Sequence, residues 1–144
     1  GGSGDVNLMF ETFDHTADIG LRARAADLDE LFAEAARALF SVIVENFDQV
    51  QPHEEVSIAV GGQRLDDLMY DWLSELLCVS DTRRILLCQF NVSVSDSGLA
   101  ATARGEPIDP ARHCLDTEVK AITYHGLKVE RSGGDWLAEI IVDL

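Results

Sequence analysis

The sequence has few basic residues and no long apolar run. Eleven Lys and Arg stand against 26 Asp and Glu, which gives the 144-residue chain a formal net charge of −15. Such an acidic surface repels phosphate backbones and anionic headgroups, so stable binding to nucleic acid or to a membrane surface is disfavoured. No apolar stretch approaches the ~20 residues that a membrane span needs, and no basic segment leads into an apolar one. We therefore expect neither a membrane span nor a signal peptide.

Cysteine is also scarce. The three cysteines, Cys78, Cys88 and Cys114, are odd in number, lie far apart and form no Cys-x-x-Cys pair. This spacing is unlike that of a zinc site or a disulfide framework. Unpaired thiols are typical of the reducing cytosol, so we predict a cytoplasmic protein whose thiols are buried and free.

Common catalytic signatures are missing. The sequence contains no Gly-x-Gly-x-x-Gly, no Walker loop, no Gly-x-Ser-x-Gly and no His-Glu-x-x-His, which are the motifs that cradle phosphates or hold nucleophiles and metals. The four histidines lie in four different segments, and no two share a helix face at ligand spacing. The motifs therefore indicate no familiar enzyme class.

The sequence does have the patterning of two amphipathic helices. The first begins at Asp27, whose carboxylate can cap the first turn, with Glu30 three residues later as in a capping box. Apolar residues then recur at helical spacing as far as Ile43. The second helix covers about residues 65–79, and the proline at position 110 predicts a third, short helix over 110–115.

The other segments mostly alternate between apolar and polar residues, which predicts strands over 6–11, 19–24, 56–60, 83–95, 99–107, 117–124, 127–129 and 136–142. Strands and long helices do not alternate regularly, which disfavours a doubly wound parallel sheet. We predict an α+β fold in a single domain, with a largely antiparallel sheet and two amphipathic helices packed on it. Residues 1–4 read as a linker or tag remnant, which leaves 5–144 as the domain.

A first candidate site is the densest polar cluster, residues 14–20. It lies between two predicted strands and contains Asp14, His15 and Asp18. Binding residues often occupy loops on rigid supports, whereas Asx and hydroxyl side chains also form tight structural turns. From the pattern alone, both interpretations stay open.

Two further places carry unusual polar residues. Asp143 follows an apolar run and precedes Leu144, the last residue given. The side chain of Asp143 and the terminal carboxylate of Leu144 would form a pair of hard oxygen ligands of the kind that Ca²⁺ or Mg²⁺ prefers. The alternative there is a frayed, charged chain end. Residues 117–127 gather Lys120 and His125 around a predicted strand. Lys120 could reach a phosphate or a carboxylate, or the segment could form one solvated strand face.

Together, these three places resemble the archease family. Its members carry an HTADIG-like segment, here His15 to Gly20, and a TEVKAITYH-like segment, here Thr117 to His125. They close with an apolar strand that ends in Asp plus one residue, here Ile140 to Leu144. The resemblance runs from about Phe10 to the end of the sequence, and it includes the start of the first helix.

The resemblance implies a protein cofactor, not itself an enzyme, for an RtcB-type RNA ligase in tRNA splicing and RNA repair. Such a protein promotes the GTP-dependent guanylylation of the ligase and so permits multiple turnover. The resemblance also implies a divalent metal, usually Ca²⁺ with Mg²⁺ or Mn²⁺ as alternatives, held by Asp18, Asp143 and a main-chain oxygen of Leu144. Lesser candidates for contact with the ligase or for support of the site are Asp14, His15, Lys120 and His125.

Two other functions stay open from the residues alone. One is a stand-alone metal-dependent hydrolase that uses Asp18, Asp143 and His15, and the other is a general chaperone or interaction module without a metal. For a shared metal site, Asp18 and Asp143 must meet, so we expect the two strands that carry them to be neighbours in the sheet.

Overall fold

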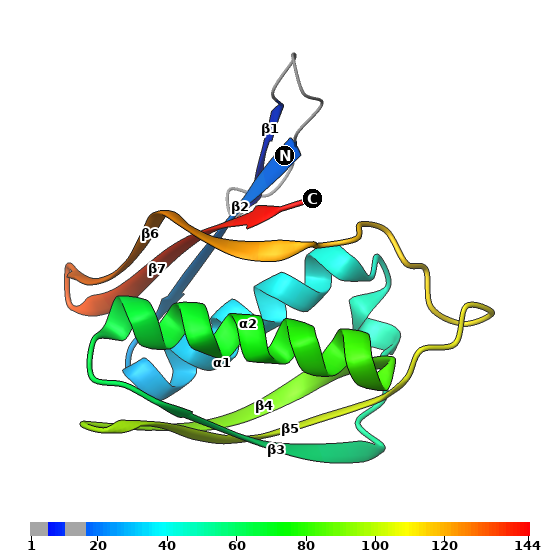
Figure 1. The fold of residues 1–144 in the computed structure, drawn as a ribbon, viewed down its shortest axis with the longest axis horizontal. Helices are drawn as coiled ribbons and strands as arrows, with labels where there is room; N and C mark the ends of the chain where they lie inside the picture. Colours follow the sequence, from blue (N-terminus) through cyan, green and yellow to red (C-terminus); the bar gives the residue numbers. More distant parts are fainter. Residues whose placement is uncertain (1–5, 11–16) are drawn as a thin grey trace.

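The computed structural model describes residues 6–10 and 17–144. The described part forms, in chain order, β1 (Val6–Phe10), β2 (Ala17–Ala25), α1 (Leu28–Ile43), the short 3₁₀ helix η1 (Phe47–Gln49), β3 (Glu54–Gly61), α2 (Leu65–Arg83), β4 (Ile85–Ser95), β5 (Gly98–Pro107), β6 (Ala121–Ser132) and β7 (Asp135–Asp143). These elements make three layers, with α1 and α2 between two antiparallel sheets (Figure 1).

The described strands divide into a four-stranded sheet with the order β1-β2-β7-β6 and a three-stranded sheet with the order β3-β5-β4. Every strand pair is antiparallel. The predicted α+β class with two packed helices is therefore confirmed, although the strands form two sheets where a single sheet was expected. Two sheets are needed because the helices bury apolar side chains on both sides.

Helix α1 shows this double burial most clearly. Its buried side chains extend around most of the helix and comprise Leu31, Phe32, Ala33, Ala35, Ala36, Leu39, Phe40 and Val42. The indole N–H of Trp72 on α2 donates to the carbonyl of Phe32 at 2.9 Å, so a buried hydrogen bond joins the two helices. The core therefore lies in the helical layer and in the sheet faces that cover it.

Three local expectations differ from the structure. The helix expected over 110–115 is absent: residues 110–112 form a turn, in which the N–H groups of Arg112 and His113 both donate to the carbonyl of Asp109, and Leu115 forms an isolated bridge to Val44. Residues 117–120 precede the strand that was expected to include them, and β6 begins at Ala121. Helix α2 continues past residue 79 to Arg83, and Arg84 ends it in a left-handed conformation with φ of 54°.

All three cysteines lie in the described part of the chain, and all are free, as expected. Their predicted burial is wrong, because Cys78 and Cys114 are exposed and only Cys88 is partly covered. Burial raises the pKa of the Cys88 thiol, and the negative charge of Glu106 adds to this effect.

Across the described helices, none is long and apolar enough to cross a membrane.

Asp27 caps α1 as predicted, since its carboxylate accepts a hydrogen bond from the N–H of Glu30 at 2.8 Å. We predict that Asp27→Ala lowers the free energy of unfolding by about 1 kcal/mol, because the first turn loses a partner for its N–H groups. Chemical denaturation measures this loss. Asp48→Ala is the matched control, because no side chain caps η1; equal losses in both variants would contradict the assignment.

Candidate functional site

The pairing of β2 with β7 brings together the two acidic residues that the sequence singled out. Asp18, the second residue of β2, lies directly opposite Asp143, the last residue of β7. The expectation that their strands are sheet neighbours is confirmed. Directly opposite residues project from the same face of a sheet with their Cβ atoms about 4.5–5.5 Å apart, so this register places two carboxyl groups side by side.

Both residues lie on the outer face of the four-stranded sheet. Their neighbours Ile19 and Val142 are buried against the helices, and side chains alternate between the faces of a strand. Asp18 and Asp143 are themselves half-exposed. The pair therefore faces solvent with the apolar core directly behind it.

A charged ladder continues along this outer face. Arg22 of β2 contacts Glu139 of β7 at 2.7 Å, and Lys128 of β6 reaches the same carboxylate at 3.1 Å. The hydrogen bond from Lys128 is the largest cause of a lowered pKa at Glu139, ahead of the opposing effect of burial. Opposite charges thus match in the middle of the sheet, whereas two like charges meet at its end.

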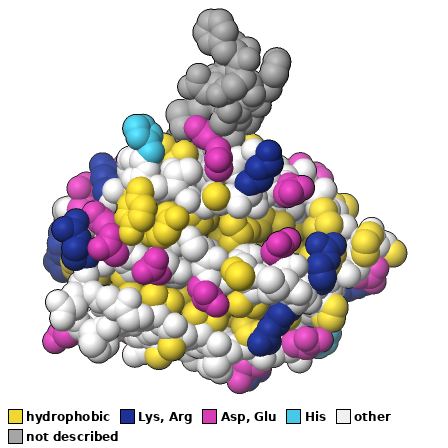
Figure 2. Space-filling model, in the orientation of Figure 1, with side chains coloured by type: hydrophobic (Ala, Val, Ile, Leu, Met, Phe, Trp, Pro, Cys, Tyr) yellow, Lys and Arg dark blue, Asp and Glu magenta, His cyan; other side chains and the backbone are white. Residues whose placement is uncertain are grey.

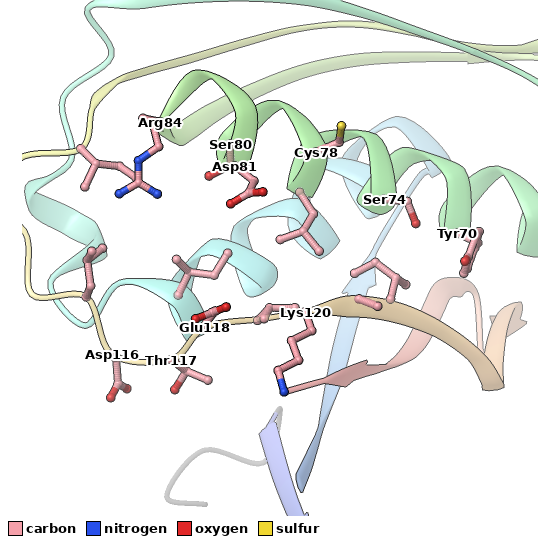
Figure 3. Close-up of a pocket in the computed structure, with 17 residues that line it drawn as sticks. Tyr70, Ser74, Cys78, Ser80, Asp81, Arg84, Asp116, Thr117, Glu118 and Lys120 are labelled. Carbon is pink, nitrogen blue, oxygen red and sulfur yellow. The ribbon is translucent and has the colours of Figure 1, made fainter. Parts of the chain in front are cut away.

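Strand β6 lies on the other side of β7 from β2 at this end of the sheet. Ala121 pairs with Asp143, and the backbone N–H of Lys120 donates to the carbonyl of Asp143 at 2.8 Å. The backbone of Lys120 therefore lies beside that of Asp143, and the side chain of Lys120 extends away from α2 (Figure 3). Its role in contact with a ligase or in support of the site stays a prediction. His125 is exposed farther along β6, in the interval where the register with β7 shifts.

A groove opens on the other side of residues 115–122. It has a volume of about 830 Å³ and lies between this segment and one face of α2 that carries Tyr70, Ser74, Leu77, Cys78 and Asp81 (Figure 3). These positions recur at helical spacing, so they share a stripe of α2. Nothing in the sequence analysis identified this groove.

A buried polar cluster anchors the segment that leads to the groove. Glu106 of β5 forms an ion pair with Arg112, and its second oxygen accepts a hydrogen bond from the backbone N–H of Gln51 at 2.6 Å. His113 is buried with Nε2 at 3.1 Å from the same carboxylate, while its Nδ1 accepts a hydrogen bond from the N–H of Asp109. The loop before β6 is thereby fixed to the three-stranded sheet.

These contacts control the ionisation of Glu106. Burial works to raise the pKa, but hydrogen bonds from Gln51, Arg112 and His113 and the charge of Arg112 outweigh it and lower the pKa to about 2. An acidic side chain with a lowered pKa stabilises the fold above its ordinary pKa and loses that contribution as the pH falls through the lowered value.

Two of the predicted site residues, Asp14 and His15, lie outside the described residues. Of the remaining ones, the structure brings Asp18, Asp143, Leu144 and Lys120 to one end of the sheet, while His125 lies apart from them. Among residues 6–10 and 17–144, no three His, Cys, Asp or Glu side chains are grouped so that they could hold a metal ion. The metal-ligand roles of Asp18, Asp143 and Leu144 stay predictions.

A sequence model of the archease protein family matches residues 10–144. The chain belongs to the archease family. It is 44% identical over 141 residues to the archease of Methanopyrus kandleri, an alignment that covers 95% of this chain and 100% of that protein. It is 40% identical to the archease of Pyrococcus abyssi, with 94% of this chain and 98% of that protein covered.

Two solved structures share the fold of this chain. The solution structure of Methanobacterium thermoautotrophicum protein 1598 matches with a TM-score of 0.80 and 38% identity, covering 92% of this chain and 96% of that one. A crystal structure of an archease from Thermotoga maritima, described as a possible chaperone, matches with a TM-score of 0.65 and covers 96% of this chain and 99% of that one. At 23% identity, this second match shows the shared fold alone.

We predict that Glu106→Gln lowers the free energy of unfolding at pH 7 by about 1–3 kcal/mol, because it leaves buried donors without their charged partner. It should also flatten the fall in stability between pH 4.5 and pH 2, since the group with the lowered pKa is gone. Denaturation at a series of pH values measures both effects.

Glu55→Gln is the matched control for this prediction. Glu55 is exposed on β3 and forms a surface ion pair with Arg104 at 3.0 Å, so its loss should cost less than about 0.5 kcal/mol. A pH profile of Glu106→Gln that is parallel to that of the parent would contradict the role of Glu106.

Proposed function

We propose that this archease is a protein cofactor that promotes the GTP-dependent guanylylation and multiple turnover of an RtcB-type RNA ligase in tRNA splicing and RNA repair. On this proposal the chain is a ligase activator without enzymatic activity of its own, and it acts in the cytoplasm. Family membership supplies the context. The observation that carries the proposal is the direct pairing of Asp18 with Asp143 at one end of the sheet.

The donor set at this end fits a divalent cation. Like charges directly opposite one another on a sheet repel, and a cation between them would offset that repulsion. Carboxylate and main-chain oxygens are the ligands that Ca²⁺ prefers, and Mg²⁺ and Mn²⁺ also accept them. Asp18, Asp143 and a main-chain oxygen of Leu144 would hold the ion, with Lys120 beside them through its bond to Asp143.

A cation at this place suits guanylyl transfer from GTP. Such chemistry needs a divalent ion to offset the charge of the triphosphate. The net charge of −15 favours approach to a basic RNA-binding enzyme and disfavours competition for its RNA. The partner would therefore supply the nucleotide site and the RNA cleft, and the archease would supply oxygen ligands at an exposed sheet end.

We predict that Asp18→Asn and Asp143→Asn each weaken Ca²⁺ binding about tenfold or more, since affinity depends on the number of charged ligands. Isothermal titration calorimetry measures the change. Asp135→Asn is the matched control at the opposite end of β7, where Asp135 pairs with Ser132. Unchanged Ca²⁺ affinity in both site variants, with parent-like melting temperatures, would rule out the shared metal site.

The function itself is tested by ligation with a cognate ligase under single- and multiple-turnover conditions. We expect the parent chain to raise multiple turnover and the yield of guanylylated ligase, and Asp143→Asn to lose most of that effect while Asp135→Asn keeps it. The chain alone should neither join RNA nor hydrolyse GTP. A chaperone role would instead appear as suppressed aggregation of unrelated proteins that a chelator leaves unchanged.

A further inference from the structure

The groove beside α2 is closed at both ends and open along its length. At one end Tyr70 of α2 stacks on Tyr124 of β6 with ring centroids 4.1 Å apart, and the hydroxyl of Tyr124 donates to Asp67 at 2.8 Å. At the other end the N–H of Ile108 donates to the carbonyl of Arg84 at 2.9 Å. Between these contacts, α2 and residues 115–122 diverge and leave a channel.

The groove offers apolar surface to a partner. Leu77, Ile108 and Ile122 line it, together with Leu115. In the described part of the chain, two large hydrophobic residues are exposed: Leu115 with an exposed fraction of 48% and Tyr124 with 51%. They lie near opposite ends of the groove. Figure 2 shows hydrophobic side chains along the band between α2 and β6. Exposed apolar side chains rimmed by polar groups are typical of interaction sites.

The rim of the groove is mainly acidic. Asp81 of α2 and Asp116 and Glu118 of the opposite wall line it, together with two basic residues, Arg84 and Lys120, and the side chain of Lys120 extends away from α2. At the aromatic end, the negative charges of Asp67 and Asp71 also surround Tyr124, and hydrogen bonding to Asp67 is the largest cause that raises its pKa to about 12. A partner segment with basic side chains complements such a rim.

We propose that this groove binds an apolar and basic peptide segment of the partner protein, alongside the Asp18–Asp143 end of the sheet. The identity of the partner as the ligase rests on the proposed function. The groove wall is continuous with that end, since Ala121 lines the groove and pairs with Asp143. Apolar side chains of the segment would enter the groove, and its lysines or arginines would meet the acidic rim.

The first experiment measures the affinity of the purified ligase for variants of the full chain by biolayer interferometry. Ser74→Arg places a bulky cation on the groove face of α2, and we expect affinity to fall about tenfold or more. Ser93→Arg is the matched control, with the same change of charge at an exposed position of β4 in the other sheet. Leu115→Ser is a second variant, which removes exposed apolar surface without adding charge.

Charge complementarity is tested by the double variant Asp81→Asn and Glu118→Gln. It should lower affinity at low salt and reduce the dependence of affinity on salt, since exposed charges are screened by added ions. Asp48→Asn with Asp96→Asn removes the same charge elsewhere on the surface and is the control. An equal effect in both double variants would show that net charge alone matters, which contradicts the acidic rim.

The occupant is identified through Cys78, which is exposed and lines the groove. In a background of Cys88→Ser and Cys114→Ser, a benzophenone probe on Cys78 should cross-link one ligase peptide that carries apolar and basic residues. A probe on Ser93→Cys, with Cys78→Ser added, should not cross-link that peptide. Cross-linking to nucleotide or RNA, or to no ligase peptide, would overturn the proposal.

The outcomes separate the two proposals. If the parent chain stimulates the ligase but Ser74→Arg and Leu115→Ser, both with parent-like melting temperatures, bind as the parent does, the groove is not the docking site. If the parent chain neither binds nor stimulates the ligase, the proposed function fails and the groove proposal fails with it. Loss of binding in the groove variants with unchanged Ca²⁺ affinity supports the groove as a site distinct from the metal ligands.

Discussion

The pairing of β2 with β7 is the contact on which the rest of the structure depends. It joins a strand near the start of the chain to the last strand, and it closes the four-stranded sheet over α1. Strand β7 lies between β2 and β6, so it joins the start of the chain to the hairpin that β6 and β7 form. The register of this one pair therefore fixes the core face of the two strands and the meeting of Asp18 with Asp143.

The register is specified by the core and not by the acidic pair. A slip of one residue would turn the inward side chains of β2, among them Ile19 and Leu21, to solvent, so burial selects a single alignment. The match of Arg22 with Glu139 supports the same alignment from the outer face. The same alignment places Asp18 opposite Asp143.

Local signals made the helices predictable, whereas the arrangement of the sheets depends on contacts between distant segments. The start of α1 at Asp27 follows from a side chain and an N–H three residues apart. The alternation of the strands shows which residues face inward, but it does not say that three strands form a second sheet. Residues 110–115 show the same limit, because His113 bonds to Glu106 of β5 and favours a turn that the proline alone does not reveal.

The candidate site also has a part that the sequence indicated and a part that depends on contacts between distant segments. The resemblance of short segments indicated Asp18, Asp143 and Lys120, and the fold brings them to one place. The groove was missed because its walls come from α2 and from residues 115–122, and neither wall has an unusual sequence by itself. A helix stripe that contains Tyr70, Ser74 and Cys78 reads as an ordinary boundary between core and solvent, and only the divergence of the opposite wall leaves it uncovered.

The loop before β6 connects these features mechanically. One end is fixed by the contacts of Arg112 and His113 with Glu106, and the other end is fixed by the bond from the N–H of Lys120 to the carbonyl of Asp143. The segment between them forms a wall of the groove. On the docking we propose, a peptide that presses on this wall would act on the main chain of Asp143 through the bond from Lys120 and the pairing with Ala121. One short, doubly anchored segment therefore connects the groove to the acidic pair.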